Sequence, residues 1–179
     1  MGLYEDNIYI KGRHATRMKE LVAKFDGQLS QGLFARNLDV YLIAPIVGKI
    51  YGWKDNVVTS VADSTSIHVE QMNREMENLL ANFRTLALLE NKDKLDIDTR
   101  TSNAFRYDRD DEKRKAIDAE FEKYVLGGID VLYEKLFENA KTTDDFVMNI
   151  FNFVDDFERN YASRFDFEQI EELCKLSKK

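Results

Sequence analysis

The segment from Val40 to Val47 constrains the fold of this chain more than any other. Its eight residues are all apolar or aromatic, apart from a proline at position 45. A helix that is apolar on every side normally lies at the centre of a protein, and the segment is far shorter than the ~18 residues of a membrane span. We therefore expect a central core helix within residues 30–53. Pro45 is expected either to kink this helix or to begin a second short helix.

Two pairs of glycines mark places of unusual backbone geometry. Gly48 and Gly52 lie four residues apart on one face of the expected core helix. Because glycine has no side chain, this face is expected to let another helix or a chain terminus come close. Gly127 and Gly128 stand within a second helix-forming region, where each glycine costs about 1 kcal/mol relative to alanine. We expect that region to be weakened or bent.

Apolar residues at spacings of three, four and seven predict further helices around the central one. The expected helices cover residues 13–25, 30–53, 66–90, 99–106, 117–137, 142–161 and a last segment that begins near Asp166. The helix over 66–90 would be about 37 Å long at 1.5 Å per residue. It is long enough to be the spine of the fold or to pair with a second copy of itself. In the helix over 99–106, Ala104 and Phe105 are expected to point inward.

Residues 7–11 have the alternation of a half-buried strand, with Ile8 and Ile10 on one side. The chain as a whole therefore predicts an all-α fold, a bundle of six to seven helices with at most one short N-terminal strand. We expect a single helical domain over residues 1–179, in which residues 1–54 form a strand–helix–helix subregion.

Composition and charge narrow the classes of function. The chain has 26 basic and 33 acidic residues, a net charge of −7, which argues against general affinity for nucleic-acid phosphates. The charge is uneven, because residues 1–54 carry +3 and the remainder carries −10. Residues 1–11 lack the basic and apolar regions of a secretory signal. We therefore expect a cytoplasmic protein with no membrane contact.

Chemistry-bearing motifs are scarce in the sequence. Cys174 is the only cysteine, so there is no intramolecular disulfide and no cysteine zinc cage. His14 and His68 fall in different expected elements, and a metal site built from them would need carboxylates from elsewhere. The acidic residues of 108–112 lack the glycine and terminal glutamate of a calcium loop. No phosphate-binding glycine motif or nucleophile motif occurs. We expect no metal, no cofactor and no catalytic residue.

The order strand, helix, turn, helix in residues 7–53 resembles a ribbon-helix-helix module. In that family two chains pair their strands, and the resulting ribbon enters the DNA major groove. The resemblance implies that Ile8 and Ile10 enter a dimer core. It also implies a DNA-binding set made of Asn7, Tyr9, Lys11, Arg13 and Arg17, in which the two arginines hold phosphates. Asparagine pairs with adenine and lysine with guanine in this groove. The alternative is a terminal strand that packs on the chain's own core.

Four functions remain open at this point. Residues 7–53 also resemble small helical accessory proteins of bacterial phage-defence and DNA-modification loci, of the DndE type. The 20 phenylalanine and tyrosine residues suit burial or interfaces. The first hypothesis is therefore a non-enzymatic accessory protein that acts in a protein complex or homo-oligomer. The second is a DNA-binding regulator, and the third is an acidic inhibitor that mimics nucleic acid with residues 55–179. The fourth is a hydrolase whose catalytic groups converge from distant positions.

Overall fold

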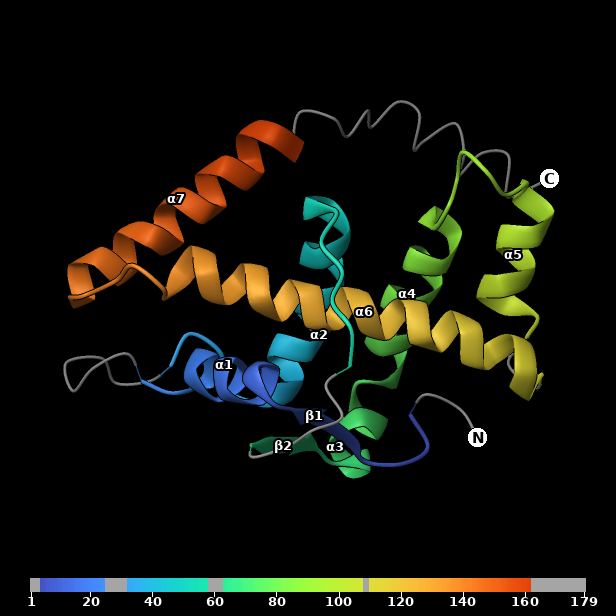
Figure 1. Ribbon diagram of the computed structural model, residues 1–179, viewed down its shortest axis with the longest axis horizontal. Helices are drawn as coiled ribbons and strands as arrows, with labels where there is room; N and C mark the ends of the chain where they lie inside the picture. Colours follow the sequence, from blue (N-terminus) through green and yellow to red (C-terminus); the bar gives the residue numbers. More distant parts are fainter. Residues whose placement is uncertain (1–3, 25–31, 58–62, 108–109, 162–179) are drawn as a thin grey trace.

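The computed structural model describes residues 4–24, 32–57, 63–107 and 110–161, in which helices predominate (Figure 1). The elements are β1 (Ile8–Lys11), α1 (Arg13–Val22), α2 (Asn37–Tyr51), β2 (Ser64–Ile67), α3 (Val69–Arg74), α4 (Met76–Leu89), α5 (Ile97–Phe105), α6 (Asp111–Leu136) and α7 (Thr143–Tyr161). The predicted mostly helical fold class is confirmed. None of the helices in these four ranges has both the length and the hydropathy that a bilayer crossing requires.

The crossing of α2 and α6 is the most extensive contact between two described elements, and glycines make it possible. A Cβ atom at Gly128 would lie 1.7 Å from the carbonyl oxygen of Ala44, and one at Gly48 would lie 2.2 Å from that of Tyr124. The two backbones therefore touch, which confirms that Gly48 admits another helix. Gly52 has open space around it and instead ends α2 in a left-handed conformation, with φ at 65°.

Helix α2 occupies the centre of the fold, as its apolar sequence predicts. It runs without interruption through Pro45, so the alternative in which Pro45 begins a second helix is wrong. Two apolar side chains of α2 reach the surface, since Ile43 is 42% exposed and Ile46 is also exposed. Helix α6 likewise continues through Gly127 and Gly128, because contact with α2 offsets their low helix propensity.

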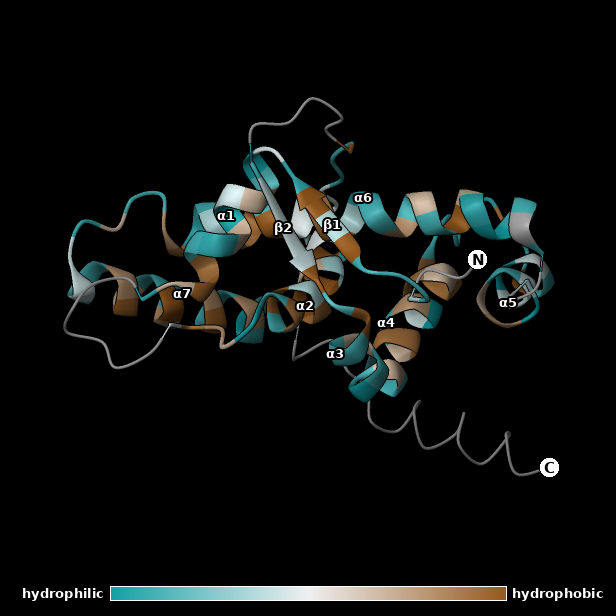
Figure 2. Cartoon of the chain, turned by 90° about the horizontal axis from the view of Figure 1, so that it is seen from below, coloured by the Kyte–Doolittle hydropathy of each residue, from teal (hydrophilic) through white to brown (hydrophobic). Residues whose placement is uncertain are grey.

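The predicted N-terminal strand is present as β1, and it pairs antiparallel with β2 of the same chain. Figure 2 shows the two strands side by side next to α1. Ile8 lies opposite Ile67, and Ile10 is buried in the chain's own core. The single helix predicted over 66–90 is wrong, because this region divides into the end of β2, α3 and α4. Local spacing cannot reveal β2, since its partner strand lies more than 50 residues away.

Helices α4, α5 and α6 form one end of the molecule (Figure 1). In α5, Ala104 is buried as expected, but Phe105 is 47% exposed, so its predicted inward position is wrong. Its ring instead lies beneath the guanidinium of Arg84, 5.2 Å from the ring centroid. A surface aromatic can hold a cation in this way without entering the core.

Helix α7 follows α6 and extends away from it at the other end of the molecule (Figure 1). Phe146 is buried and packs against Phe137, with ring centroids 4.8 Å apart. Phe153 stacks on Tyr51 at the end of α2, at 6.3 Å. The last predicted helix, from Asp166 and including Cys174, lies outside the described residues.

Candidate functional site

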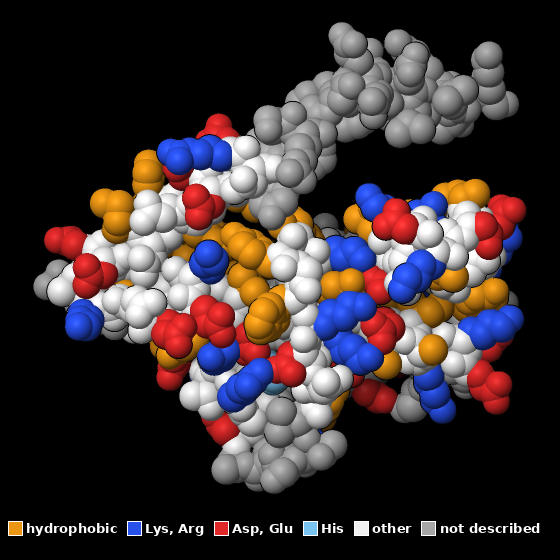
Figure 3. Space-filling view, turned by 45° about the horizontal axis from the view of Figure 1, so that its top comes forward, with side chains coloured by type: hydrophobic (Ala, Val, Ile, Leu, Met, Phe, Trp, Pro, Cys, Tyr) orange, Lys and Arg blue, Asp and Glu red, His pale blue; other side chains and the backbone are white. Residues whose placement is uncertain are grey.

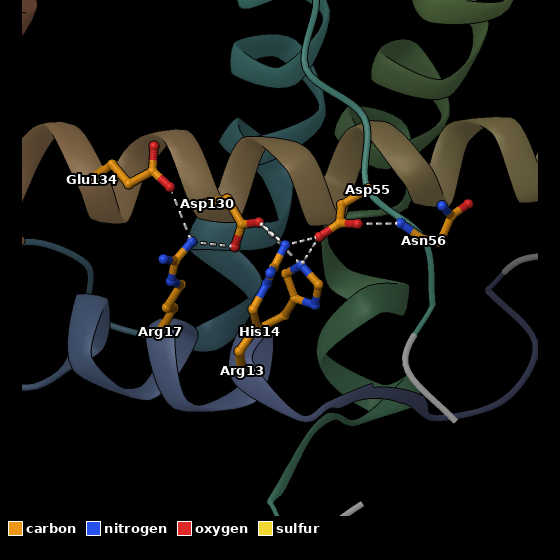
Figure 4. Close-up of polar contacts among 7 residues, drawn as sticks. All are labelled: Arg13, His14, Arg17, Asp55, Asn56, Asp130 and Glu134. Carbon is orange, nitrogen blue, oxygen red and sulfur yellow. Dashed lines mark hydrogen bonds and ion pairs between the residues drawn. The ribbon is translucent and has the colours of Figure 1, made fainter. Parts of the chain in front are cut away.

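A buried polar cluster joins α1, the segment after α2, and α6 (Figure 4). His14 and Asp130 are fully or almost fully buried, and Asp55 is half-buried. The Nε2 atom of His14 lies 3.1 Å from Oδ2 of Asp55 and 3.4 Å from Oδ2 of Asp130. These three residues are called the His–Asp–Asp cluster below.

Backbone geometry brings the three residues together. Gly12 has a positive φ of 62° and turns the chain from β1 into α1, so that His14 stands in the first turn of that helix. A Cβ atom at Gly127 would lie 2.3 Å from the carbonyl oxygen of Trp53, so the segment after α2 lies directly on α6. Asp130 is three residues beyond Gly127 and shares its helix face, where it meets Asp55.

In each carboxylate of the cluster, one oxygen faces His14 and the other contacts a partner farther out. On the outer side, Oδ1 of Asp55 accepts a hydrogen bond from the Asn56 backbone N–H at 2.7 Å. Oδ1 of Asp130 forms an ion pair with Arg17 Nη1, also at 2.7 Å. Both Oδ2 atoms turn inward to His14. The arrangement therefore holds two carboxylate oxygens and one imidazole nitrogen around a common point.

Two arginines balance the charge of the cluster. Arg13 donates to Oδ2 of Asp130 at 2.9 Å and also to Oδ2 of Asp55. Its side chain is 58% exposed, so it covers the cluster from the solvent side. Arg17 also reaches Glu134 at 3.4 Å. Burial raises the pKa of Asp130, but its hydrogen bonds and charge interactions with His14 and Arg17 outweigh burial and lower it. Asp130 is therefore ionised at neutral pH.

The His–Asp–Asp cluster has the donor set of a metal site. Its three inward atoms all lie within 4.8 Å of one another. Imidazole nitrogen and carboxylate oxygen are ligands for divalent transition metals. Sequence reasoning missed this cluster, although it noted that a histidine-based site would need carboxylates from elsewhere. Positions 14, 55 and 130 share no local motif, so no sequence signal could have found them. His68, the other histidine, is exposed beside α3.

The five residues predicted to bind DNA lie in two different settings. The Asn7 side chain accepts a hydrogen bond from the Val69 backbone N–H at 2.9 Å, and it ties the chain before β1 to α3. The two arginines, Arg13 and Arg17, belong to the cluster described above. Tyr9 and Lys11 are exposed on β1. One edge of β1 is occupied by β2, so a second copy would have to pair with the other edge.

A second feature is an apolar surface on α7. Phe146, Ile150 and Phe153 lie on the side of α7 that packs on the core. Another set is exposed and is called the outer stripe of α7 below: Val147, Met148, Phe151 and Val154. Phe151 is 65% exposed, the largest value among the exposed apolar side chains of the described residues. Figure 3 shows hydrophobic side chains along this edge of the molecule.

A third feature is an apolar cavity of about 190 Å³ between α4, α5 and α6. Glu90 lies at its edge and accepts hydrogen bonds from Lys49, Lys54 and Tyr124. Burial raises the pKa of Glu90, but these hydrogen bonds outweigh it and lower the pKa to about 2. The polar groups at the edge of the cavity are thus engaged with one another, and they tie α2 to α4 and α6.

Comparison of the chain with family models, curated proteins and solved structures gives no match. No relative therefore assigns a role to the cluster, the outer stripe or the cavity. A function must therefore be inferred from the chemistry of the cluster, the outer stripe and the cavity, and from where each lies in the fold.

Proposed function

We propose that this protein is a helical interaction subunit that binds a partner protein through the outer stripe of α7. The observation that carries this proposal is the exposure of Val147, Phe151 and Val154 at the spacing i, i+4 and i+7. Single exposed apolar residues are normal on protein surfaces, but a continuous apolar patch is typical of an interface. Phe151 has the size and position of a central anchor, since a few large side chains dominate most interfaces.

The apolar arc of α7 is wider than packing within the chain requires. A helix on a protein surface typically buries one stripe roughly 100° wide. In α7 the core-facing residues Phe146, Ile150 and Phe153 form such a stripe, and the exposed Val147 and Phe151 lie beside it. The additional width has no covering element among the described residues. It therefore supports a role in association.

Charge indicates the kind of partner. Helix α7 contains five acidic residues and one basic residue, a net charge of −4. By helical periodicity Asp144 and Glu158 lie at the two ends of the outer stripe, on its own face. Two such faces would repel each other, whereas a basic partner would be attracted. We propose that the partner is an amphipathic helix whose apolar side is flanked by lysine or arginine, seated along α7 as helices seat in apolar grooves.

The test uses two synthetic amphipathic helices with the same apolar face, one flanked by lysines and one by glutamates. Fluorescence anisotropy measures their binding to the full chain. We expect the lysine-flanked helix to bind and the other not to. Phe151→Ser should weaken binding by roughly 30-fold, the effect of losing a strong interface anchor. The neighbouring exposed Asn152→Ser is the matched control and should change little.

Two results would contradict this proposal. One is equal binding of the lysine-flanked helix to the wild type and to Phe151→Ser. The other is a dimer, seen by light scattering, that Phe151→Ser converts to monomer, because the outer stripe would then bind a second copy of the chain. Circular dichroism of both variants checks that the helices remain folded.

Binding of DNA through β1 stays a prediction. Tyr9 and Lys11 are free to meet solvent, whereas Asn7, Arg13 and Arg17 have partners within the chain. DNA contact by all five residues would require these three to leave their partners. A salt-dependent mobility shift of duplex DNA, weakened by Lys11→Ala, would support the prediction. Absence of a shift at low salt would contradict it.

A further inference from the structure

We propose that the His–Asp–Asp cluster binds one divalent ion of a first-row transition metal. The ligands would be Nε2 of His14, Oδ2 of Asp55 and Oδ2 of Asp130. The proposal is independent of the outer stripe of α7, which lies on another element. It rests on the spacing of the three atoms, on the contacts that hold the carboxylates, and on the position of Arg13.

The spacing of the three atoms suits a single ion. Ligand atoms about 2.1 Å from a metal are about 3.0 Å apart at neighbouring octahedral positions and about 3.4 Å apart at tetrahedral ones. The nitrogen of His14 lies 3.1 Å from its oxygen neighbour on Asp55 and 3.4 Å from that on Asp130. The two oxygens lie within 4.8 Å of each other, so a small side-chain movement brings all three to one centre.

The outer oxygens of the two carboxylates are held by separate partners. The Asn56 backbone N–H holds Oδ1 of Asp55, and Arg17 holds Oδ1 of Asp130. Such contacts fix the orientation of metal-binding carboxylates and are a regular part of metal sites. Here they leave the Oδ2 atoms directed at the same point as the imidazole (Figure 4). Arg17 can keep its contact when the ion binds.

Arg13 places a positive charge beside the inward oxygens of Asp55 and Asp130, so this point of the cluster favours a cation. Its guanidinium is shared by both inward carboxylate oxygens, and more than half of its side chain is exposed. An ion entering from solvent would displace this guanidinium, which then becomes hydrated. The two carboxylates supply a charge of −2, which matches a divalent ion. The remaining coordination positions would face the solvent on the side that Arg13 leaves.

The donor set also narrows the choice of metal. One imidazole and two carboxylates suit manganese, iron, cobalt and zinc. Calcium and magnesium prefer oxygen ligands alone, and copper(I) prefers sulfur. Cobalt(II) is a useful probe because its visible absorption changes when nitrogen and oxygen ligands replace water. Manganese(II) provides a second probe, read by its electron paramagnetic resonance signal.

The experiment titrates cobalt(II) and manganese(II) into the full chain after treatment with a chelator. We expect one bound ion per chain, with a new visible absorption band for cobalt. Asp55→Asn should weaken binding by at least ~10-fold. Arg13→Ala should strengthen it by about tenfold or more, because a competing cation is removed. The control is Asp63→Asn, which alters a half-buried carboxylate that pairs with Lys19 outside the cluster. This variant should bind both metals as tightly as the wild type.

Asp130 is buried and pairs with two arginines, so the variant Asp130→Asn can fail to fold. The variants Asp55→Asn and Arg13→Ala therefore test the metal site without a change at Asp130. The proposal is overturned if neither the wild type nor Arg13→Ala binds a stoichiometric ion. It is also overturned if Asp55→Asn binds as tightly as the wild type. A cluster that serves only as an ion-pair network would give the first result, with Arg13→Ala less stable to heat than the wild type.

Discussion

Gly128→Ala tests the close crossing of α2 and α6 on which the fold depends. The added Cβ would lie 1.7 Å from the carbonyl oxygen of Ala44 and 2.4 Å from its carbonyl carbon. An ordinary carbon–oxygen contact is about 3.3 Å or longer. Both atoms belong to the backbone of α2 and cannot rotate away. The two helices must therefore separate by more than about 1 Å, which disturbs the packing along their whole contact.

The expected change in the free energy of unfolding follows from two opposing effects. Alanine is the better helix former by about 1 kcal/mol, so local propensity alone predicts that Gly128→Ala stabilises the chain. Overpacking of a well-packed core costs about 1–3 kcal/mol, and a clash between backbones belongs at the upper end. The expected net loss in the free energy of unfolding is about 2 kcal/mol. In a chain of this length that loss lowers the melting temperature by roughly 4–8 °C.

Urea unfolding followed by circular dichroism measures the change, together with the melting temperature. Ala119→Gly, on the exposed side of α6, is the matched control for propensity and should cost about 1 kcal/mol. The reasoning is refuted if Gly128→Ala raises the free energy of unfolding, or leaves it unchanged at the same denaturant slope. Either result would mean that α2 and α6 do not meet at this glycine.

Three further predictions concern stability. The pKa of Glu90 is about 2, below its usual 4.5. The stability that the ionised Glu90 adds to the folded chain is therefore complete above pH 4.5 and is lost as the pH falls toward 2. Glu90→Gln should therefore destabilise the chain at pH 7 by up to about 3 kcal/mol and should flatten the fall in stability between pH 5 and pH 2; an unchanged pH profile would contradict this. Asp96 caps α5 by accepting a hydrogen bond from the Thr99 N–H, so Asp96→Ala should cost about 1 kcal/mol in urea unfolding, whereas the exposed Asp93→Ala should cost almost nothing. Phe83 is buried in the core, and Phe83→Ala should lower the free energy of unfolding by about 3–5 kcal/mol; a loss below 1 kcal/mol would show that the site is not packed as described.

Local periodicity was sufficient to locate most of the helices. The spacing of apolar residues predicted α1, α5 and α7 to within a few residues, because the side of a helix that faces the core repeats every 3.6 residues. The all-apolar segment ending at Val47 predicted the central position of α2 for the same reason. The prediction failed over 66–90, where residues 64–67 take their conformation from pairing with β1. Phe105 also departed from its expected place, since α5 packs mainly on α4 and this ring stays at the surface beneath Arg84.

The candidate site lay beyond sequence reasoning for a physical reason. His14 lies in the amphipathic helix α1, and Asp130 is a single charge in the apolar middle of α6, so the sequence near each residue does not reveal its partners. What places them together is the close approach of backbones at Gly127 and Gly128, which carries Asp55 onto α6. The sequence predicted α7 as a helix over 142–161, but it did not single out the outer stripe of α7. Which of its residues are covered depends on where α7 leaves the core.

The sequence by itself determined that this chain forms a mostly helical fold around one apolar helix, because helix formation and the burial of an apolar stripe depend on residues close together in the chain. Tertiary structure alone decided that β2 pairs with β1, that α2 and α6 touch through Gly48 and Gly128, and that an imidazole meets two carboxylates beneath Arg13. These outcomes depend on contacts between residues more than 40 positions apart. Such contacts form only when the whole set of helices packs, so no short stretch of sequence encodes them.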